Sequence, residues 1–262
     1  MRVIAQTNLQ LYNQLRLQGR EDSQLALAKR AYDLSALLYA GYYQGDGKPF
    51  VAHTVGVASI LAWLDLPGEV VAFGALHNVY GNGDFGDGLQ HATTPARRSR
   101  VRVAAGAVVE DMVYRFRDFR ISSKTVDRIE GELDRMGEVE RHMVLADLAD
   151  YLEKYVDLGV QYFGDSNWIT TEIDQLGARL IAVSERLEQP LLAEMMREAF
   201  AAASKQPGPP QELRNTGGRH ITLTLPLSAR PRLGPITRVW LRRQRRRVGR
   251  RLSRMIAAAP KP

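Results

Sequence analysis

A short apolar stretch that ends in two polar side chains places the strongest constraint on this sequence. Residues 70–76 are all apolar or glycine, and they are followed by His77, Asn78 and a glycine-rich loop over residues 81–88. The stretch is far shorter than a membrane span and predicts a buried helix. Polar groups at the end of a buried helix need partners, so we expect His77 and Asn78 to bond a metal ion, a substrate or each other.

The composition is that of an ordinary globular chain without cysteine. Of the 262 residues, 45% are hydrophobic and 25% are charged, which is enough for a core of normal size in one large domain or two small ones. The lack of cysteine excludes disulfides, thiolate-bound zinc and a cysteine nucleophile. The first residues contain no secretory signal and no apolar run is long enough for a membrane span, so we expect a cytoplasmic protein.

The excess positive charge is concentrated in the last part of the chain. The formal net charge is +7, yet residues 230–262 hold 12 Lys or Arg and no acidic residue. The rest of the chain is left with 24 basic and 29 acidic residues. Apolar residues within 238–256 recur near one helical face, so this tail can form a basic helix that binds nucleic acid or an anionic membrane surface. The alternative is a disordered, solubilising tail.

Helical periodicity dominates residues 1–204, which we predict to form one all-α helical bundle of seven to nine helices. Residues 205–219 are rich in proline and glycine and predict a linker. Residues 220–225 alternate between apolar and polar, so they can pair as a single strand or stay extended, and the flexible basic tail follows them. The predicted helices cover about 2–18, 22–43, 51–64, 67–81, 96–114, 124–136 (short and exposed), 138–158, 170–187 and 191–204.

Two histidines and an aspartate are the candidate ligands of a metal ion. His53 begins one predicted helix and His77 ends the next, and consecutive antiparallel helices bring such positions together. Asp147 lies at the edge of an apolar helix face, where an unpaired carboxylate is costly. Two imidazoles and a carboxylate suit a divalent ion such as manganese, iron or zinc, which can activate water. The alternatives are histidines that are hydrogen-bonded in the core, and an Asp147 that is paired with an arginine such as Arg141 or with a lysine.

Three segments of the chain carry a resemblance to a known family. The segments are Gly45-x-Gly47-Lys48-Pro49-Phe50-Val51-Ala52-His53, Ala75-Leu76-His77-Asn78-Val79-Tyr80 and Leu145-Ala146-Asp147. They resemble the HD-domain superfamily, most closely the hydrolase half of the RelA/SpoT alarmone enzymes, over about residues 25–155. The resemblance implies a helical HD bundle in which His53, His77 and Asp147 are metal ligands. The chain is also similar to an HD-like family with a His-Ser-hydrophobic-Tyr-Gly motif, which residues 77–81 fit better.

The chain departs from the alarmone hydrolases at three positions. Asn78 stands where those enzymes have the aspartate of the His-Asp pair, and Gly81-Asn82 stands in place of their Glu-Asp pair. Gln44 replaces the arginine that lies against the guanine base. A neutral amide is a poorer ligand than a carboxylate and cannot take a proton from water, so we expect weaker metal affinity and no alarmone hydrolysis.

Further polar residues can complete the site. We take Asn78, Tyr80 and Glu110 as the candidate catalytic residues, with Asn78 orienting water or substrate. Glu110 and Asp111 lie beside apolar residues of a predicted helix, and the alternative for them is a salt bridge to Arg115 or Arg117. The alternative for Tyr80 is packing.

Three functions follow from these patterns. The first is a degenerate HD-type, metal-dependent hydrolase that acts on a small phosphorylated or otherwise anionic metabolite. The second is a catalytically inactive HD-fold scaffold or ligand-binding protein. The third is binding of nucleic acid or anionic membrane through residues 230–262, with the folded part as an inert domain.

Overall fold

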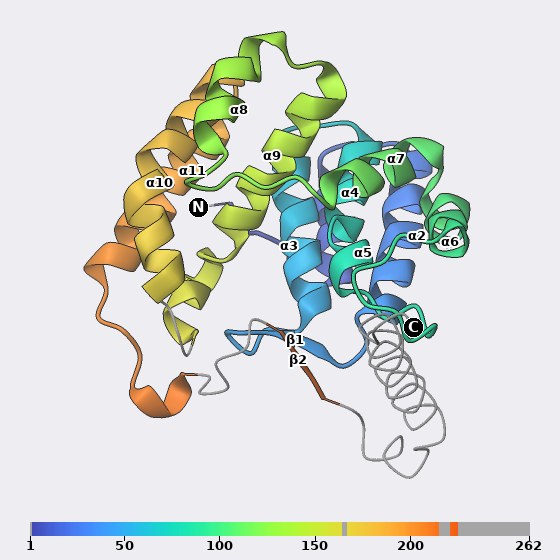
Figure 1. Cartoon of the computed structure of the whole chain (residues 1–262), viewed down its shortest axis with the longest axis horizontal. Coiled ribbons are helices and arrows are strands. Elements are labelled where there is room, and N and C mark those ends of the chain that lie inside the picture. Colours follow the sequence, from blue (N-terminus) through green and yellow to red (C-terminus); the bar gives the residue numbers. More distant parts are fainter. Residues whose placement is uncertain (1, 164–166, 215–220, 225–262) are drawn as a thin grey trace, which may run out of the picture. The chain divides into compact units, whose positions relative to one another are not determined.

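The computed structural model describes residues 2–163, 167–214 and 221–224, and this part of the chain is all-α as predicted (Figure 1). It contains eleven α-helices, three short 3-10 helices and one two-stranded sheet. None of the helices in these residues combines the length and the apolar character that crossing a membrane requires. The α-helices are α1 (Asn8–Leu17), α2 (Asp22–Leu38), α3 (Phe50–Trp63), α4 (Gly68–Leu76), α5 (Val79–Asn82), α6 (Pro95–Ala105), α7 (Ala107–Phe116), α8 (Val126–Glu132), α9 (Glu138–Glu153), α10 (Asn167–Arg186) and α11 (Pro190–Lys205). The 3-10 helices are η1 (Leu133–Arg135), η2 (Val156–Tyr162) and η3 (Gln211–Leu213), and the strands are β1 (Tyr42–Gln44) and β2 (Ile221–Leu223).

The apolar helices α3 and α4 form the centre of the fold. Residues 53–62 of α3 and 70–76 of α4 are all buried, which confirms the buried helix predicted from the sequence. The two helices approach closely at Gly74, where an added Cβ would lie 2.6 Å from Cδ1 of Leu61 and 3.2 Å from the backbone of Ala58. Helix α3 also packs on α9, and α4 packs on α2 and α7 (Figure 1). This packing fixes the ends of both helices relative to α9.

The first helix begins at Asn8 and not at residue 2. Thr7 accepts a hydrogen bond from the backbone of Gln10, whose side chain accepts one from the backbone of Thr7, so that the helix has a complete capping box. The segment before it runs along α3, where the backbone N–H of Ala5 donates to Oγ of Ser59 at 2.9 Å.

One predicted helix is in fact two. The expected helix over residues 96–114 is interrupted at Gly106, whose φ of 92° is in the left-handed region that favours glycine. Helix α6 therefore ends at Ala105 and α7 begins at Ala107 in a new direction. The turn allows α7 to pack on both α4 and α6.

The segment over residues 124–136, predicted to be a short, exposed helix, is helical and largely exposed, but one of its faces is buried. Helix α8 and the turn η1 bury Val126, Ile129 and Leu133 completely. These residues follow one another at intervals of three and four, which places them on one face of the helix. That face belongs to the hydrophobic core.

The expected helix over residues 138–158 ends early. Helix α9 ends at Glu153, and within η2 both Asp157 and Leu158 have positive φ, at 53° and 58°. Left-handed backbone at two consecutive residues cannot continue an α-helix.

A small sheet joins the segment between α2 and α3 to the segment that follows η3. Strand β2 confirms the strand predicted at 220–225, and it pairs antiparallel with β1, with Tyr43 opposite Thr222. Strand β1 was not predicted, because the helix expected over residues 22–43 includes residues 42–43. The observed helix α2 ends at Leu38. Gly41, with φ of 77°, allows the turn between this helix and β1.

The chain divides into two compact units, 1–223 and 224–262. The strand β2 therefore belongs to the first unit, together with the helices. Helix α11 extends to Lys205, the first residue of the predicted linker. The predicted basic helix at 238–256 lies outside the described residues.

Candidate metal centre

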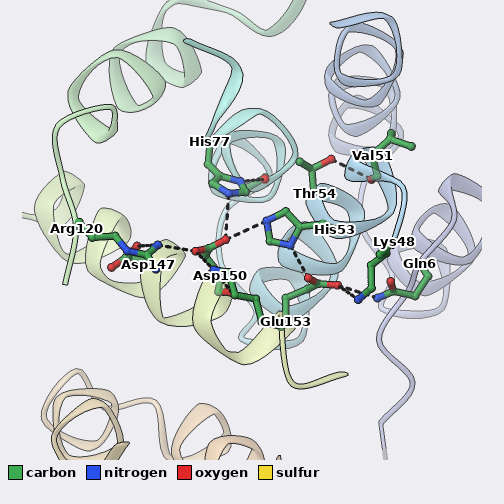
Figure 2. A network of polar contacts seen from close by, with 12 residues as sticks. Gln6, Lys48, Val51, His53, Thr54, His77, Arg120, Asp147, Asp150 and Glu153 are labelled. Carbon is green, nitrogen blue, oxygen red and sulfur yellow. Dashed lines mark hydrogen bonds and ion pairs between the residues drawn. The ribbon is translucent and has the colours of Figure 1, made fainter. Parts of the chain in front are cut away.

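Three elements deliver two imidazoles and a carboxylate to one buried point (Figure 2). His53 lies in the first turn of α3, His77 caps the C-terminus of α4, and Asp150 lies in the second half of α9. One ligand atom from each of the three lies within 4.8 Å of the other two, and all three residues are buried. Ligands of a single transition-metal ion, bound at about 2.0–2.2 Å each, occupy a similar span.

The three ligand atoms face one another at close range. Oδ1 of Asp150 lies 2.9 Å from Nε2 of His53 and 3.5 Å from Nε2 of His77. The rings of His53 and His77 pack edge to face, with centroids 5.4 Å apart. Nevertheless, Oδ1 of Asp150 and Nε2 of His77 are buried with no hydrogen-bond partner in the described part of the chain. The atoms approach without the alignment that a hydrogen bond needs, as expected for groups aimed at a common point beside them.

Acceptors on the far side of each ring fix both imidazoles. Nδ1 of His77 lies 2.7 Å from the carbonyl oxygen of Gly74, and Nδ1 of His53 makes a very short contact with Oε2 of Glu153. A carbonyl oxygen only accepts hydrogen bonds, so the Nδ1 of His77 must carry the proton. In the neutral ring of His77, Nε2 then carries a lone pair and no proton. Metal-binding histidines have the same arrangement, with one nitrogen on the ion and the other donating to a carboxylate or carbonyl.

These lone pairs require a positive charge between them. Two imidazole nitrogens and a carboxylate oxygen repel one another at such distances unless a proton or a metal ion lies among them. Burial alone would lower the pKa of His53, but the adjacent Glu153 and Asp150 outweigh it and raise that pKa. The group is therefore built to hold a cation, either a proton on His53 or a metal ion.

Cations on the opposite edge of Asp150 hold its carboxylate in place. Oδ2 of Asp150 accepts a hydrogen bond from Arg120 at 2.7 Å and another from Lys154. Burial would raise the pKa of Asp150, but Lys154, the two imidazoles and Arg120 hold it well below its usual range. Asp150 is thus ionised, with one oxygen bound to these cations and the other facing the two imidazoles.

Glu153 is fixed in the same way. Its Oε1 accepts hydrogen bonds from Lys48 at 2.7 Å and from Gln6 at 3.3 Å. Burial would raise the pKa of Glu153, but His53 and Lys48 lower it. Glu153 was not among the predicted site residues, although it follows Asp150 by three positions and so shares its helix face.

Asp147, the predicted third ligand, lies one turn away from this point. Its Oδ2 accepts a hydrogen bond from the backbone N–H of Ile121 at 2.7 Å, and its Oδ1 accepts one from Arg120 at 3.2 Å. Burial raises the pKa of Asp147, and Arg120 opposes that shift. The carboxylate that faces both imidazoles is Asp150, and the cation that pairs with Asp147 is Arg120 in place of the suggested Arg141.

Two of the predicted catalytic residues, Tyr80 and Glu110, bond each other. The hydroxyl of Tyr80 donates to Glu110 at 3.0 Å, and Arg98 and Arg102 of α6 bind the same carboxylate at 2.6–2.9 Å. Desolvation would raise the pKa of Glu110, but the two arginines and the tyrosine lower it. The cluster ties α6 to α7 across Gly106, and a catalytic role for its members stays a prediction.

Asp111 and Asn78 complete the predicted set. Asp111 forms a salt bridge with Arg115 at 3.9 Å, which is the alternative given for it in the sequence analysis. Glu110 instead pairs with two arginines of α6. Asn78 is half-buried at the start of α5 and does not cap that helix with its side chain. It directly follows His77, so it borders the buried group, and its amide is not used in the helix cap.

The helices and the buried group together define a helical domain that encloses two imidazoles and a carboxylate. A comparison with family models matches residues 37–119 to a domain of unknown function, DUF6817. The matched residues extend from the end of α2 past α7 and include His53 and His77, but they stop before Asp150 and Glu153. A comparison with curated proteins found no match.

Proposed function

We propose that this chain is a degenerate HD-type domain that binds one divalent metal ion and hydrolyses a small phosphorylated or otherwise anionic metabolite. His53, His77 and Asp150 would hold the ion, which would be manganese, iron or zinc. One observation carries the proposal: both imidazoles are held through Nδ1 by outer acceptors, and their Nε2 atoms face the same carboxylate oxygen, Oδ1 of Asp150.

The charges around the centre favour an anionic substrate. Three buried carboxylates, Asp147, Asp150 and Glu153, are balanced by the cations of Arg120, Lys154 and Lys48. A divalent ion would leave the site with a net positive charge, which attracts anions. The side chain of Arg120 is 41% exposed and forms the solvent edge of this network.

The metal ion and the residues around it would then have separate roles in hydrolysis. A bound divalent ion polarises a phosphoryl oxygen or lowers the pKa of a bound water. Asn78, directly after His77, would orient the water or the substrate. Arg120 and Lys154 would attract the anionic group while they hold Asp150 in position.

The same charge balance supports a second candidate function. Because three carboxylates and three cations already neutralise one another, the network can remain closed without a metal ion and with a proton on His53. The domain would then be an inactive HD-fold scaffold or ligand-binding protein. The two candidates differ in metal content.

Metal analysis of the purified protein separates them. After expression with added manganese, iron or zinc, the wild type should carry about one ion per chain, whereas Asp150→Asn and His77→Ala should carry almost none. Asp147→Asn is the matched control, because it changes an equally buried aspartate one turn away and should keep the ion. Hydrolysis of a simple phosphomonoester should follow the metal content.

A wild-type protein without stoichiometric metal would rule out the metal enzyme and leave the scaffold. Metal that persists in Asp150→Asn and disappears in Asp147→Asn would show that the ligand set is wrong.

A further inference from the structure

Tyr39 places a buried hydroxyl near the candidate metal centre. The side chain is 2% exposed, and its OH has no hydrogen-bond partner in the described part of the chain. A buried hydroxyl that bonds nothing is costly, and such groups in a native fold indicate a missing partner.

The ring of Tyr39 is separated from His53 by one aromatic ring, that of Phe50. It packs on Phe50 with centroids 4.4 Å apart, and Phe50 contacts the ring of His53 edge to face at 5.5 Å. Its backbone is fixed at the end of α2 by a hydrogen bond from Tyr39 N to the carbonyl of Ser35 at 2.9 Å. The negative charge of Asp150 reaches the phenol and adds to the effect of burial, and together they raise the pKa of Tyr39 well above its usual value. The hydroxyl therefore keeps its proton and can donate a hydrogen bond, and it lies within the electrostatic influence of Asp150.

A donor and two acceptors are thus left unsatisfied in one region. The donor is the OH of Tyr39, and the acceptors are Nε2 of His77 and Oδ1 of Asp150. The hydroxyl forms no hydrogen bond with either of these acceptors. An oxygen bound at the metal centre would lie against the two ligand residues and supply the acceptor that Tyr39 lacks.

We propose that Tyr39 is a substrate-binding residue, whose hydroxyl donates a hydrogen bond to an oxygen of a phosphate-like oxyanion held at the His53–His77–Asp150 centre. This inference rests on the proposed metal site and adds to it a residue that distinguishes an oxyanion from a neutral ligand. Phenylalanine would keep the packing on Phe50 and remove only the donor.

The test is the binding of inorganic phosphate to the manganese-loaded protein, measured by titration calorimetry. Tyr39→Phe should bind phosphate about tenfold more weakly than the wild type, as expected for the loss of one hydrogen bond to a charged oxygen. Its metal content should be unchanged, and its unfolding temperature should be equal or higher, because the hydroxyl that is lost bonds nothing in the protein. Tyr12→Phe, a change on α1, is the matched control and should bind phosphate like the wild type.

The outcomes separate the two proposals. A wild type that holds no manganese refutes the metal site and this inference with it. A wild type that holds manganese while Tyr39→Phe binds phosphate normally refutes only the role of Tyr39. Loss of manganese in Tyr39→Phe also refutes it, because Tyr39 would then support the metal site and not the oxyanion.

Discussion

Glu153 binds Nδ1 of His53 and thereby turns the opposite ring nitrogen toward Asp150. Lys48 and Gln6 hold the second oxygen of the same carboxylate, so Glu153 is itself unable to rotate away. An outer carboxylate in this position fixes the tautomer and the orientation of an imidazole ligand and increases its basicity. Glu153 is therefore a positioning residue for the candidate metal centre.

Replacement of Glu153 by glutamine should weaken metal binding without abolishing it. The amide keeps the size of the side chain but loses the charge that favours a proton on Nδ1, and changes of this kind cost about 10–100-fold in metal affinity. Manganese titration of the metal-free protein measures the effect. Glu140→Gln, in the exposed first turn of the same helix, should bind like the wild type, and equal affinities of all three proteins would contradict the role of Glu153.

Asp147 should matter for stability more than for metal binding. Asp147→Ala removes the acceptor of the buried N–H of Ile121 and one partner of Arg120, and we expect a loss of about 1–3 kcal/mol in the free energy of unfolding. Asp147→Asn retains an oxygen for Ile121 and should lose less. Urea unfolding followed by circular dichroism tests both changes. A stable Asp147→Ala variant that has lost its metal would reverse this assignment.

The sequence indicated two of the three candidate ligands because their positions follow from helix order. His53 at the start of one helix and His77 at the end of the next must come close when the helices run antiparallel. The carboxylate was harder to place, because Leu-Ala-Asp occurs twice in succession in residues 145–150. Both aspartates lie on one face of α9, three residues apart, and only the direction of the backbone near Ile121 decides which of them is used elsewhere.

The fold was predictable where periodicity is strong and not where backbone geometry decides. The all-α class and the buried α4 follow from the apolar pattern. The break between α6 and α7 depends on the positive φ of Gly106. A single glycine inside a helical pattern does not predict such a break. The strand at residues 42–44 is stabilised by pairing with residues 221–223, a long-range partner that local preference cannot reveal.

Gly74 should tolerate no side chain. A Cβ there would lie 2.6 Å from Leu61 and 3.2 Å from the backbone of Ala58, so Gly74→Ala should destabilise the fold by about 1–3 kcal/mol. Because the carbonyl of Gly74 holds His77, metal affinity should fall as well. Gly131→Ala is the matched control, since a Cβ at this helical position meets nothing within 4 Å and should be neutral or stabilising by about 0.5–1 kcal/mol. Thermal unfolding of the two variants tests the contrast, which would fail if Gly74→Ala were as stable as the wild type.

Glu110 should make stability depend on acid pH. Desolvation raises the pKa of Glu110, but Arg98, Arg102 and Tyr80 together lower it below the ordinary value of 4.5. The unfolded chain then takes up the proton more readily than the folded chain. The ion pairs thus stabilise the fold fully above the unfolded pKa, and this contribution disappears as the pH falls through the lower, folded pKa.

Glu110→Gln should therefore be less stable than the wild type at neutral pH, and the difference should shrink on the acid side. Urea unfolding of both proteins at about pH 7 and about pH 3 measures it. A difference that stays the same at both values would mean that Glu110 contributes by packing and not by charge.

The basic tail, residues 230–262, should account for any binding of polyanions by this chain. The boundary of the first compact unit indicates where the chain should be truncated to test this. Truncation after Lys205 would also delete β2, which pairs with β1 and belongs to the first compact unit. Truncation after Thr224 keeps that pairing and removes all 12 basic residues of 230–262.

The full chain should bind DNA or anionic vesicles with an affinity that falls steeply with salt, because each neutralised charge releases a counterion. The truncated chain should bind neither in a fluorescence-anisotropy or vesicle-sedimentation assay, whereas its metal content should stay that of the full chain. Binding that survives the truncation would place the polyanion site in the helical domain, where the net charge is negative.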